Sequence, residues 1–289
     1  MRFLKKNWFV ETAYPDVTIA LEVSEKLYSG KSQFQKIEIY QTKRFGKMLA
    51  LDGVVQTTVG DEYVYHEMIT HVPLCSHPEP QNILIIGGGD GGVAREALKH
   101  SSVEKITLVE IDAKVVEFSK KYLPEISGGA FDSPKLEVRL EDGAKFIKNK
   151  SETYDVIIVD SSDPIGPSTV LFSEGFNHDL AKSLKPDGIV VRQSGSSFFL
   201  QEPLQDLYRT MCKVFRHNAL YTAAVPTYIG GFFTFVFATR EPSKSCRPCD
   251  LDKLKLRYAK LAGKTRYYNP ELHLASFQLP NYLADLLVK

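Results

Sequence analysis

The chain has 289 residues, of which 43% are hydrophobic and 25% charged, so its composition is that of an ordinary globular protein with a sizeable core. Lysine and arginine total 36 against 35 for aspartate and glutamate, a balance that excludes the broad positive field by which proteins recruit nucleic acid or anionic membranes. Four cysteines are too few for a disulfide framework, and no apolar run reaches signal-peptide length near the start or the roughly 18 residues of a membrane span elsewhere. We therefore expect a cytoplasmic protein with no nucleic-acid or membrane partner.

Residues 1–60 predict a small antiparallel β domain. Three runs are strand-like, at 17–23, 34–41 and 47–58. Glycines are expected at the turns, at Gly30, Gly46 and Gly53. The segment 61–71 has apolar and aromatic residues at helical spacing after an acidic start, which predicts a helix leading into a second domain. We place the domain boundary between residues 60 and 61.

Residues 61–289 alternate strands with amphipathic helices, which predicts a parallel sheet covered on both faces. Strands are expected at 82–86, 105–110, 136–140, 154–160 and 188–193. Helices are expected near 92–99, 113–122, 143–149, 173–184 and 202–214. Two further strands, 218–225 and 232–239, are separated by PTYIGG, whose proline and glycines suit a hairpin turn. This layout predicts an α/β protein with a class I methyltransferase-like, Rossmann-like domain that ends in an antiparallel hairpin and follows the small β domain.

The last part of the chain predicts two helices, at 250–262 and 280–288. Cys246 and Cys249 form one CxxC pair just before them. Because no second pair or nearby histidine completes a zinc site, we expect no bound metal.

A glycine-rich loop at 87–92 follows the first strand of the second domain and precedes a helix, so Gly87 and Gly89 can bring the backbone close to a ligand. Gly87, Gly89 and Gly92 satisfy the GxGxxG spacing of dinucleotide sites, which is a weak signal by itself. Asp90 stands inside the loop, where its carboxylate would repel a pyrophosphate at the helix N-terminus. The loop therefore favours a cationic nucleoside without phosphate, although Asp90 could also act only as a helix cap.

Acidic residues follow the next two strands at the same edge of the predicted sheet. Glu110 comes 23 residues after Gly87, where a carboxylate can accept hydrogen bonds from ribose hydroxyls; a solvated helix start is the alternative. Asp142 follows the third strand and could accept the adenine amino group, while Gly143 lets the backbone approach the ring. Together with the glycine loop, these positions predict an adenosine site.

Two more carboxylates follow the fourth strand, in VIIVDSSDPIGPSTVLF. Asp160 ends the strand, and Asp163 lies in a loop that Pro164 and Pro167 stiffen. By itself this spacing could be an Asx turn. Beside an adenosine site, however, Asp160, Asp163 and Asp90 form an acidic pocket suited to a substrate with one or two ammonium groups.

Several long motifs resemble those of the spermidine synthase family, above all its bacterial members. They are LDGVVQTT at 51–58, DEYVYHEM at 61–68, GGGDGG at 87–92, VEID at 109–112 and DSSDPIGP at 160–167. The likeness runs from about Trp8 to RYYNP at 266–270, nearly the whole chain. It implies an enzyme that transfers the aminopropyl group of decarboxylated S-adenosylmethionine, its co-substrate, to putrescine, giving spermidine and 5′-methylthioadenosine without a metal.

The resemblance also implies roles for individual residues. It makes Asp160 the catalytic base. It places the adenosyl or thioether part of the donor on Gln33, Glu110, Asp142, Gly143 and Pro167. Around the diamine and the aminopropyl arm it places Tyr65, His66, Asp90, Asp163, Gln193 and Tyr228. Some related enzymes carry glutamine where His66 stands here.

The expected reaction is a direct displacement in which an amine attacks the carbon bonded to the sulfonium. An aspartate with a pKa of about 3.9 is a poor base for an ammonium near 10, so we expect Asp160 to orient the amine and relay its proton through Tyr65 or water. Asp90 would hold the ammonium of the donor and repel the carboxylate of ordinary S-adenosylmethionine.

Three other functions fit parts of this pattern. A putrescine N-methyltransferase would use S-adenosylmethionine on the same amine, a nicotinamide dehydrogenase would use the GxGxxG spacing, and a noncatalytic binder would hold polyamine alone. The sequence leaves the choice among putrescine, cadaverine, agmatine and spermidine open. Because the small β domain offers sheet edges and an apolar face, we expect a homodimer.

Overall fold

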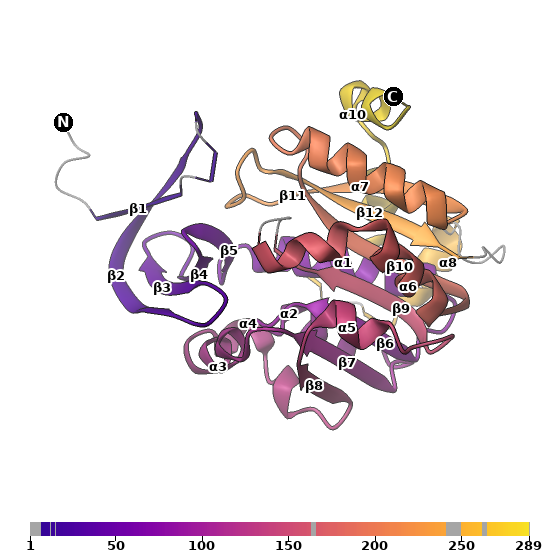
Figure 1. Ribbon diagram of the computed structural model, residues 1–289, viewed down its shortest axis with the longest axis horizontal. Helices are drawn as coiled ribbons and strands as arrows, with labels where there is room; N and C mark the ends of the chain where they lie inside the picture. The colour runs from indigo at the N-terminus through magenta and orange to yellow at the C-terminus, as the bar shows by residue number, and fades with distance from the viewer. Residues whose placement is uncertain are drawn as a thin grey trace.

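The computed structural model of the chain describes residues 7–11, 13–14, 16–162, 166–240, 250–261 and 265–288, with the side chains of 166–168 left out. Asp163, Cys246, Cys249 and the Pro167 side chain, all named above, lie outside this description. A small sheet lies beside a larger α/β unit (Figure 1). Among the described residues, no helix is long and apolar enough to cross a membrane.

The small sheet has five antiparallel strands in sequential order. They are β1 (Trp8–Glu11), β2 (Ile19–Lys31), β3 (Lys36–Thr42), β4 (Lys47–Leu51) and β5 (Val54–Thr58). The expected run 47–58 is two strands because Asp52 and Gly53 turn the chain with positive φ angles of 49° and 82°. Gly30 is not at a turn as expected: β2 pairs with β3 as far as Lys31, and Gly30 faces Ile37 inside the ladder. The turn is made instead by residues 32–35.

Helix α1 (Glu62–Ser76) leads from the small sheet into the larger unit and runs five residues beyond its expected end. All residues of α1 except Tyr63 are buried, so the helix buries polar as well as apolar side chains. Its polar side chains must therefore find partners inside the protein, because a buried polar group without a hydrogen bond is costly.

The large sheet has seven strands in the order β11-β12-β10-β9-β6-β7-β8. They are β6 (Asn82–Gly87), β7 (Lys105–Glu110), β8 (Leu136–Leu140), β9 (Tyr154–Asp160), β10 (Leu184–Ser196), β11 (His217–Ala224) and β12 (Phe232–Thr239). The first five are parallel, and β12 pairs antiparallel with both β10 and β11. The central strands are continuous apolar runs because helices cover both faces. The predicted Rossmann-like domain with a terminal antiparallel hairpin is confirmed.

Helices cover the large sheet in two groups. One core cluster joins one face to α1, α2 (Gly92–Leu98), α8 (Leu251–Tyr258) and α9 (Pro270–Ser276). The other joins the opposite face to α5 (Gly143–Ile147), α6 (Glu174–Ser183), α7 (Gln201–Val214) and α10 (Asn281–Val288). The sequence analysis did not predict α9, which is only seven residues long. This helix begins at a proline, and the Asn269 side chain caps its N-terminus.

A third cluster ties the small sheet to the large unit. Apolar residues of β3 and β4 pack against α3 (Ala113–Tyr122) and α4 (Pro124–Ser127). Short 3-10 turns lie at Ala130–Asp132 (η2) and Gly166–Phe172 (η3). This packing holds the small sheet over the carboxyl ends of β6, β7 and β9, where the sequence predicts the site. The domain boundary at residues 60 and 61 stays a prediction.

Candidate active site

A cavity of about 600 Å³ lies between the small sheet and the carboxyl edge of the large sheet. Most of the predicted site residues line it. These are Tyr65, His66, Gly87, Gly89, Asp90, Glu110, Asp142, Gly143, Asp160, Gln193 and Tyr228. The structure thus brings together residues that are spread over more than 160 positions of sequence, from Tyr65 to Tyr228.

Close packing explains the glycines of the loop after β6. Gly87 has a φ of 85°, and a side chain there would collide with the carbonyl of Asp160. The two strand ends are joined by a hydrogen bond in which the Gly88 amide donates to that carbonyl at 2.9 Å. A side chain at Gly89 would lie 2.9 Å from Glu110 Oε2. Only glycine lets the loop lie this close to the backbone of Asp160 and to the carboxylate of Glu110.

Glu110 is a buried carboxylate at the end of β7. Its Oε1 accepts a hydrogen bond from the Asp112 amide at 2.9 Å. Burial, reinforced by the charges of Asp112 and Asp160, raises the pKa of Glu110 to about 7. Ligand hydroxyls that donate to this carboxylate would therefore stabilise its charged form.

The predicted contact of Gln33 requires correction. Gln33 is exposed and does not border the cavity, whereas Gln35 does. Within the turn at 32–35, Gln35 Nε2 donates to Asp112 Oδ2 at 3.0 Å, and Ser32 donates to the same oxygen at 2.6 Å. These bonds point Gln35 toward the end of β7 and leave Gln33 on the outer side of the turn.

Asp142 and Gly143 stand where α5 begins. Asp142 Oδ1 accepts the amides of Ala144 at 2.9 Å and Lys145 at 3.3 Å, so it caps the helix and also borders the cavity. Gly143 packs so close to Ile86 that a side chain would lie 2.5 Å from its Cγ2. Ile86 and Val109 add apolar surface at this end of the cavity, which suits a flat aromatic base.

Asp160 ends β9 and borders the cavity, and its side chain is only partly buried. The Tyr65 hydroxyl donates to Asp160 Oδ1 at 2.5 Å. Burial and then the charge of Asp90 raise the pKa of Asp160 to about 6, against the opposing effect of His66 and the Tyr65 bond. Tyr65 also packs among aromatic rings, 5.7 Å from Tyr228 between ring centres. Carboxylate and aromatic faces together suit a cationic amine.

Asp90, which lies against His66, is the second carboxylate of the cavity that could bind a cationic group. Asp90 Oδ1 accepts the Gly92 amide at 2.8 Å, and its Oδ2 lies 3.3 Å from His66 Nε2. The other ring nitrogen of His66 lies 2.6 Å from Glu62 Oε2. Burial opposes charge on this ring, but Asp90 and Glu62 together raise the pKa of His66 to about 10. Asp90 therefore accepts a hydrogen bond from the first residue of α2 and also borders the cavity.

Gln193 and Tyr228 hold the chain around the cavity. Gln193 Nε2 donates to the carbonyl of Ser161 at 2.7 Å, directly after Asp160. The Tyr228 hydroxyl, at the tip of the β11–β12 hairpin, donates to the Gln56 carbonyl of β5 at 2.5 Å. Both side chains thus fix the backbone next to the site and also face the cavity.

Sequence reasoning missed the residues that the small sheet and its first connection contribute, including Glu11, Tyr14 and Gln56. Glu11 is a buried carboxylate in β1, and its Oε2 accepts the Val55 amide at 2.7 Å. The sequence signal was an acidic residue directly after the apolar run WFV, and it does not by itself indicate a site because edge strands often carry charged residues. Among the described residues, no group of His, Cys, Asp and Glu side chains is arranged to hold a metal ion.

Comparisons with known proteins agree with this geometry. A spermidine synthase tetramerisation domain matches residues 7–59, and a spermine/spermidine synthase domain matches 62–247. The chain is 45% identical over 98% of its length to a polyamine aminopropyltransferase of Ruegeria sp., covering 99% of that protein. It is 44% identical over 97% of its length to polyamine aminopropyltransferase 1 of Bacillus cereus, covering 98% of it.

Two solved structures are similar along the whole fold. A spermidine synthase in complex with the transition-state analogue AdoDATO gives a TM-score of 0.90 at 37% identity, with 100% of this chain and 99% of that one covered. Spermidine synthase from Thermotoga maritima gives a TM-score of 0.89 at 37% identity, with 98% and 95% covered.

Proposed function

The chain belongs to the spermine/spermidine synthase family, and from this premise we propose that it is a polyamine aminopropyltransferase. It transfers the aminopropyl group of decarboxylated S-adenosylmethionine to putrescine, and the products are spermidine and 5′-methylthioadenosine. The observation that carries this proposal is the pair of carboxylates Asp160 and Asp90 on one cavity wall, beside the carboxylate of Glu110 at the next strand end.

The cavity has room and chemistry for both substrates. We place the adenosine on Glu110, Asp142 and Gly143, with Gln35 at the edge of the same end. The ammonium of the aminopropyl arm lies against Asp90. The attacking amine of putrescine lies against Asp160 and Tyr65. Asp163, Pro167, Gln193 and Tyr228 remain proposed contacts from the family resemblance.

The far ammonium of the diamine needs an anionic partner at the other end of the cavity. Glu11 offers one, because its carboxylate is buried in the small sheet and borders the cavity. Tyr14 and Gln56 also border the cavity. This arrangement supports a two-ended grip on the diamine, in which Glu11 selects for a second positive charge.

The transfer is a single displacement. The amine nitrogen forms a bond to the terminal aminopropyl carbon, the carbon–sulfur bond breaks, and its electron pair makes sulfur a neutral thioether. The nitrogen loses one proton toward Asp160. With a pKa of about 6, Asp160 is a better acceptor than an exposed aspartate near 3.9, although it still lies about four pKa units below an ammonium near 10. Holding nitrogen, carbon and sulfur in line can lower the activation barrier by on the order of 7–11 kcal/mol.

The competing functions have less support. The relatives described above are named polyamine aminopropyltransferases, and ordinary S-adenosylmethionine would bring its carboxylate toward Asp90. A dinucleotide would bring its pyrophosphate to the same residue. A binder of polyamine alone would not need the carboxylate of Glu110 at the adenosine end.

The matched tetramerisation domain indicates an oligomer. We propose that its smallest unit is a homodimer formed through the small sheet, and that the enzyme works in the cytoplasm. We also propose residues 60 and 61 as the boundary between the two domains. Size-exclusion chromatography with light scattering tests the assembly, because a dimer and a tetramer differ twofold in mass.

The activity is tested by methylthioadenosine release from the purified protein with putrescine, using decarboxylated and ordinary S-adenosylmethionine as alternative donors. We expect release only from the decarboxylated donor, with an equal amount of spermidine. S-adenosylhomocysteine from the ordinary donor would instead identify a methyltransferase. Replacing putrescine by cadaverine, agmatine or spermidine then measures the acceptor range.

A further inference from the structure

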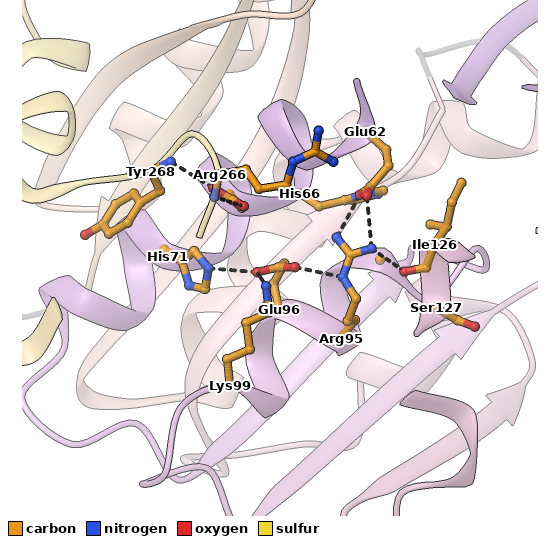
Figure 2. A network of polar contacts seen from close by, with 12 residues as sticks. Glu62, His66, His71, Arg95, Glu96, Lys99, Ile126, Ser127, Arg266 and Tyr268 are labelled. Atoms are coloured by element: carbon orange, nitrogen blue, oxygen red, sulfur yellow. Dashed lines mark hydrogen bonds and ion pairs between the residues drawn. The ribbon is translucent and has the colours of Figure 1, made fainter. Parts of the chain in front are cut away.

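A row of charged side chains joins α1 to α2 behind the cavity (Figure 2). Arg95 donates to both oxygens of Glu62, at 3.0 and 2.8 Å. Arg95 is itself held by the carbonyl of Ile126 and by Glu96 Oε1, the latter at 2.7 Å. This bidentate pair fixes the Glu62 carboxylate in position and orientation.

Glu62 in turn orients His66, one helical turn further along α1. Its Oε2 lies 2.6 Å from His66 Nδ1, and Asp90 Oδ2 lies 3.3 Å from His66 Nε2. A neutral imidazole carries only one N–H, so one of these contacts would set a lone pair against a carboxylate. Both contacts are favourable only when both ring nitrogens carry a proton.

The charges around His66 lead to the same state. His66 faces Glu62 and the ring of Tyr65 on α1 and Asp90 in the glycine loop. Arg95 of α2 binds the same Glu62 carboxylate, and His66 also interacts with the charge of Asp160 at the end of β9. In the immediate group, two carboxylates, Glu62 and Asp90, stand against one guanidinium. A proton on His66 balances that group.

Arrival of a second cation at Asp90 upsets this balance. The proposed function brings the ammonium of the donor to Asp90, where an imidazolium already serves as its counter-ion. Two cations on one carboxylate repel each other, whereas a neutral His66 would offer its Nε2 lone pair to the ammonium. Release of the imidazolium proton therefore relieves the repulsion and adds a hydrogen bond.

Resting on the proposed function, we propose that Glu62, held by Arg95, is a positioning residue that keeps His66 doubly protonated against Asp90 until the donor binds, and that donor binding expels one proton from His66. The Nε2–H bond breaks, its electron pair stays on nitrogen, and the proton passes to solvent. Glu62 keeps the Nδ1–H in place, so the ring presents its free lone pair to the ammonium.

This proton exchange makes donor affinity depend on pH. Because the bound state holds one proton fewer, binding tightens as pH rises, by up to tenfold per pH unit while pH lies between the pKa of His66 in the complex and its value of about 10 in the free protein. At pH 8, Glu110 and Asp160 are largely ionised before binding, since their pKa values are about 7 and 6. Measurements at that pH therefore report mainly on His66.

The test is isothermal titration calorimetry of the full-length protein with decarboxylated S-adenosylmethionine at pH 8, in buffers of different ionisation enthalpy. We expect close to one proton released per donor bound by the wild-type protein, and close to none by His66→Gln. Glu62→Gln should lower the proton count while donor binding remains. The matched control is Glu174→Gln, because Glu174 and His178 form an exposed pair at the same i,i+4 spacing, 3.9 Å apart on α6.

The outcomes separate the two proposals. Equal proton release by the wild type and His66→Gln would overturn this inference, although donor binding and methylthioadenosine formation would still support the proposed function. Wild-type proton release that Glu62→Gln leaves unchanged would remove Glu62 from the positioning role. Failure of the wild type to bind the donor at all would overturn the proposed function itself.

Discussion

Two sets of carboxylates in this protein have opposite electrostatics. Burial works against the charge of Glu96 between α1 and α2, but hydrogen bonds from His71 and Lys99 and the charge of Arg95 lower its pKa to about 2. Glu110 and Asp160 border the cavity, and burial raises their pKa values to about 7 and about 6. Among the described residues, neither forms an ion pair with a lysine or arginine.

The difference separates structure from function. Between α1 and α2, the carboxylates of Glu62 and Glu96 are each neutralised by cations of the chain itself, so their charge is compensated within the fold. At the strand ends the chain supplies backbone amides and a hydroxyl but no contacting cation. Those carboxylates are left for groups that a substrate brings, which is the pattern expected of a catalytic site.

The largest effect is expected at Asp160. Asp160→Asn removes the proton acceptor while keeping the shape of the side chain, so turnover should fall about 10³-fold. Binding of methylthioadenosine, measured by calorimetry, should persist because the adenosine contacts are elsewhere. Asp206→Asn is the matched control, since Asp206 is 77% exposed on α7. Unchanged methylthioadenosine release by Asp160→Asn would remove that residue from the reaction.

The second largest effect is expected on the free energy of unfolding, at Glu96, a carboxylate that is paired with cations. Glu96→Gln leaves Arg95 and Lys99 without the charge that they share, so the free energy of unfolding should fall by about 3–5 kcal/mol in urea titrations. Glu174→Gln on the surface should change it by less than about 0.5 kcal/mol. If the two variants unfolded at the same urea concentration, the network would not have the structural role assigned to it.

Replacing glutamate by glutamine at a cavity carboxylate, Glu110, should change the free energy of unfolding in the opposite direction. The pKa of Glu110 is about 7 in the folded protein and near 4.5 when unfolded, so its charge costs stability that grows between pH 4.5 and 7 and is full above pH 7. Glu110→Gln should therefore raise the unfolding free energy by about 1–3 kcal/mol at pH 8 and leave it unchanged at pH 4.

That gain in stability should be accompanied by a loss of function. Without the carboxylate, Glu110→Gln should bind methylthioadenosine about 10- to 100-fold more weakly, as expected for hydrogen bonds to a charged group. Thermal unfolding at pH 8 and pH 4 and calorimetry with methylthioadenosine provide the two readouts. A variant that is less stable than the wild type at pH 8 would contradict the proposed separation of the two sets.

The smallest effect distinguishes Gln35 from Gln33. Gln35→Ala should raise the KM for decarboxylated S-adenosylmethionine about fivefold, the effect of one neutral hydrogen bond. Gln33→Ala, on the exposed side of the same turn, should leave KM unchanged. Steady-state kinetics of the two variants make the comparison, and an effect of Gln33→Ala alone would restore the original assignment.

The fold and the strand-end part of the site were predictable from sequence because each rests on local order. Alternating apolar runs give the parallel sheet, and parallel strands bring Glu110, Asp142 and Asp160 to one edge. The error at Gln33 arose inside a turn, where a shift of two residues moves a side chain from the outside to the cavity. No periodicity determines that shift.

Other features depend on contacts between distant segments. Glu11 reaches the cavity only because β1 pairs with β2 and its carboxylate accepts an amide of β5. The proton on His66 depends on Glu62 and Asp90 together, which belong to different elements. Sequence spacing places Glu62 one turn from His66, but it does not reveal Arg95 of α2 as the residue that holds the glutamate.

The bonds at the start of α1 set a condition for engineering by domain exchange. Asp61 accepts a hydrogen bond from Thr58 at 2.6 Å and from the amide of Thr227 at 2.8 Å, while the Tyr228 hydroxyl donates to the Gln56 carbonyl. The hairpin tip is thereby fastened to the small sheet, although it is more than 160 residues away in the chain. A chimaera that takes its small sheet from another protein must also take residues 225–231 from that protein. Otherwise the hairpin tip and the small sheet, which together border the cavity, would not form these hydrogen bonds.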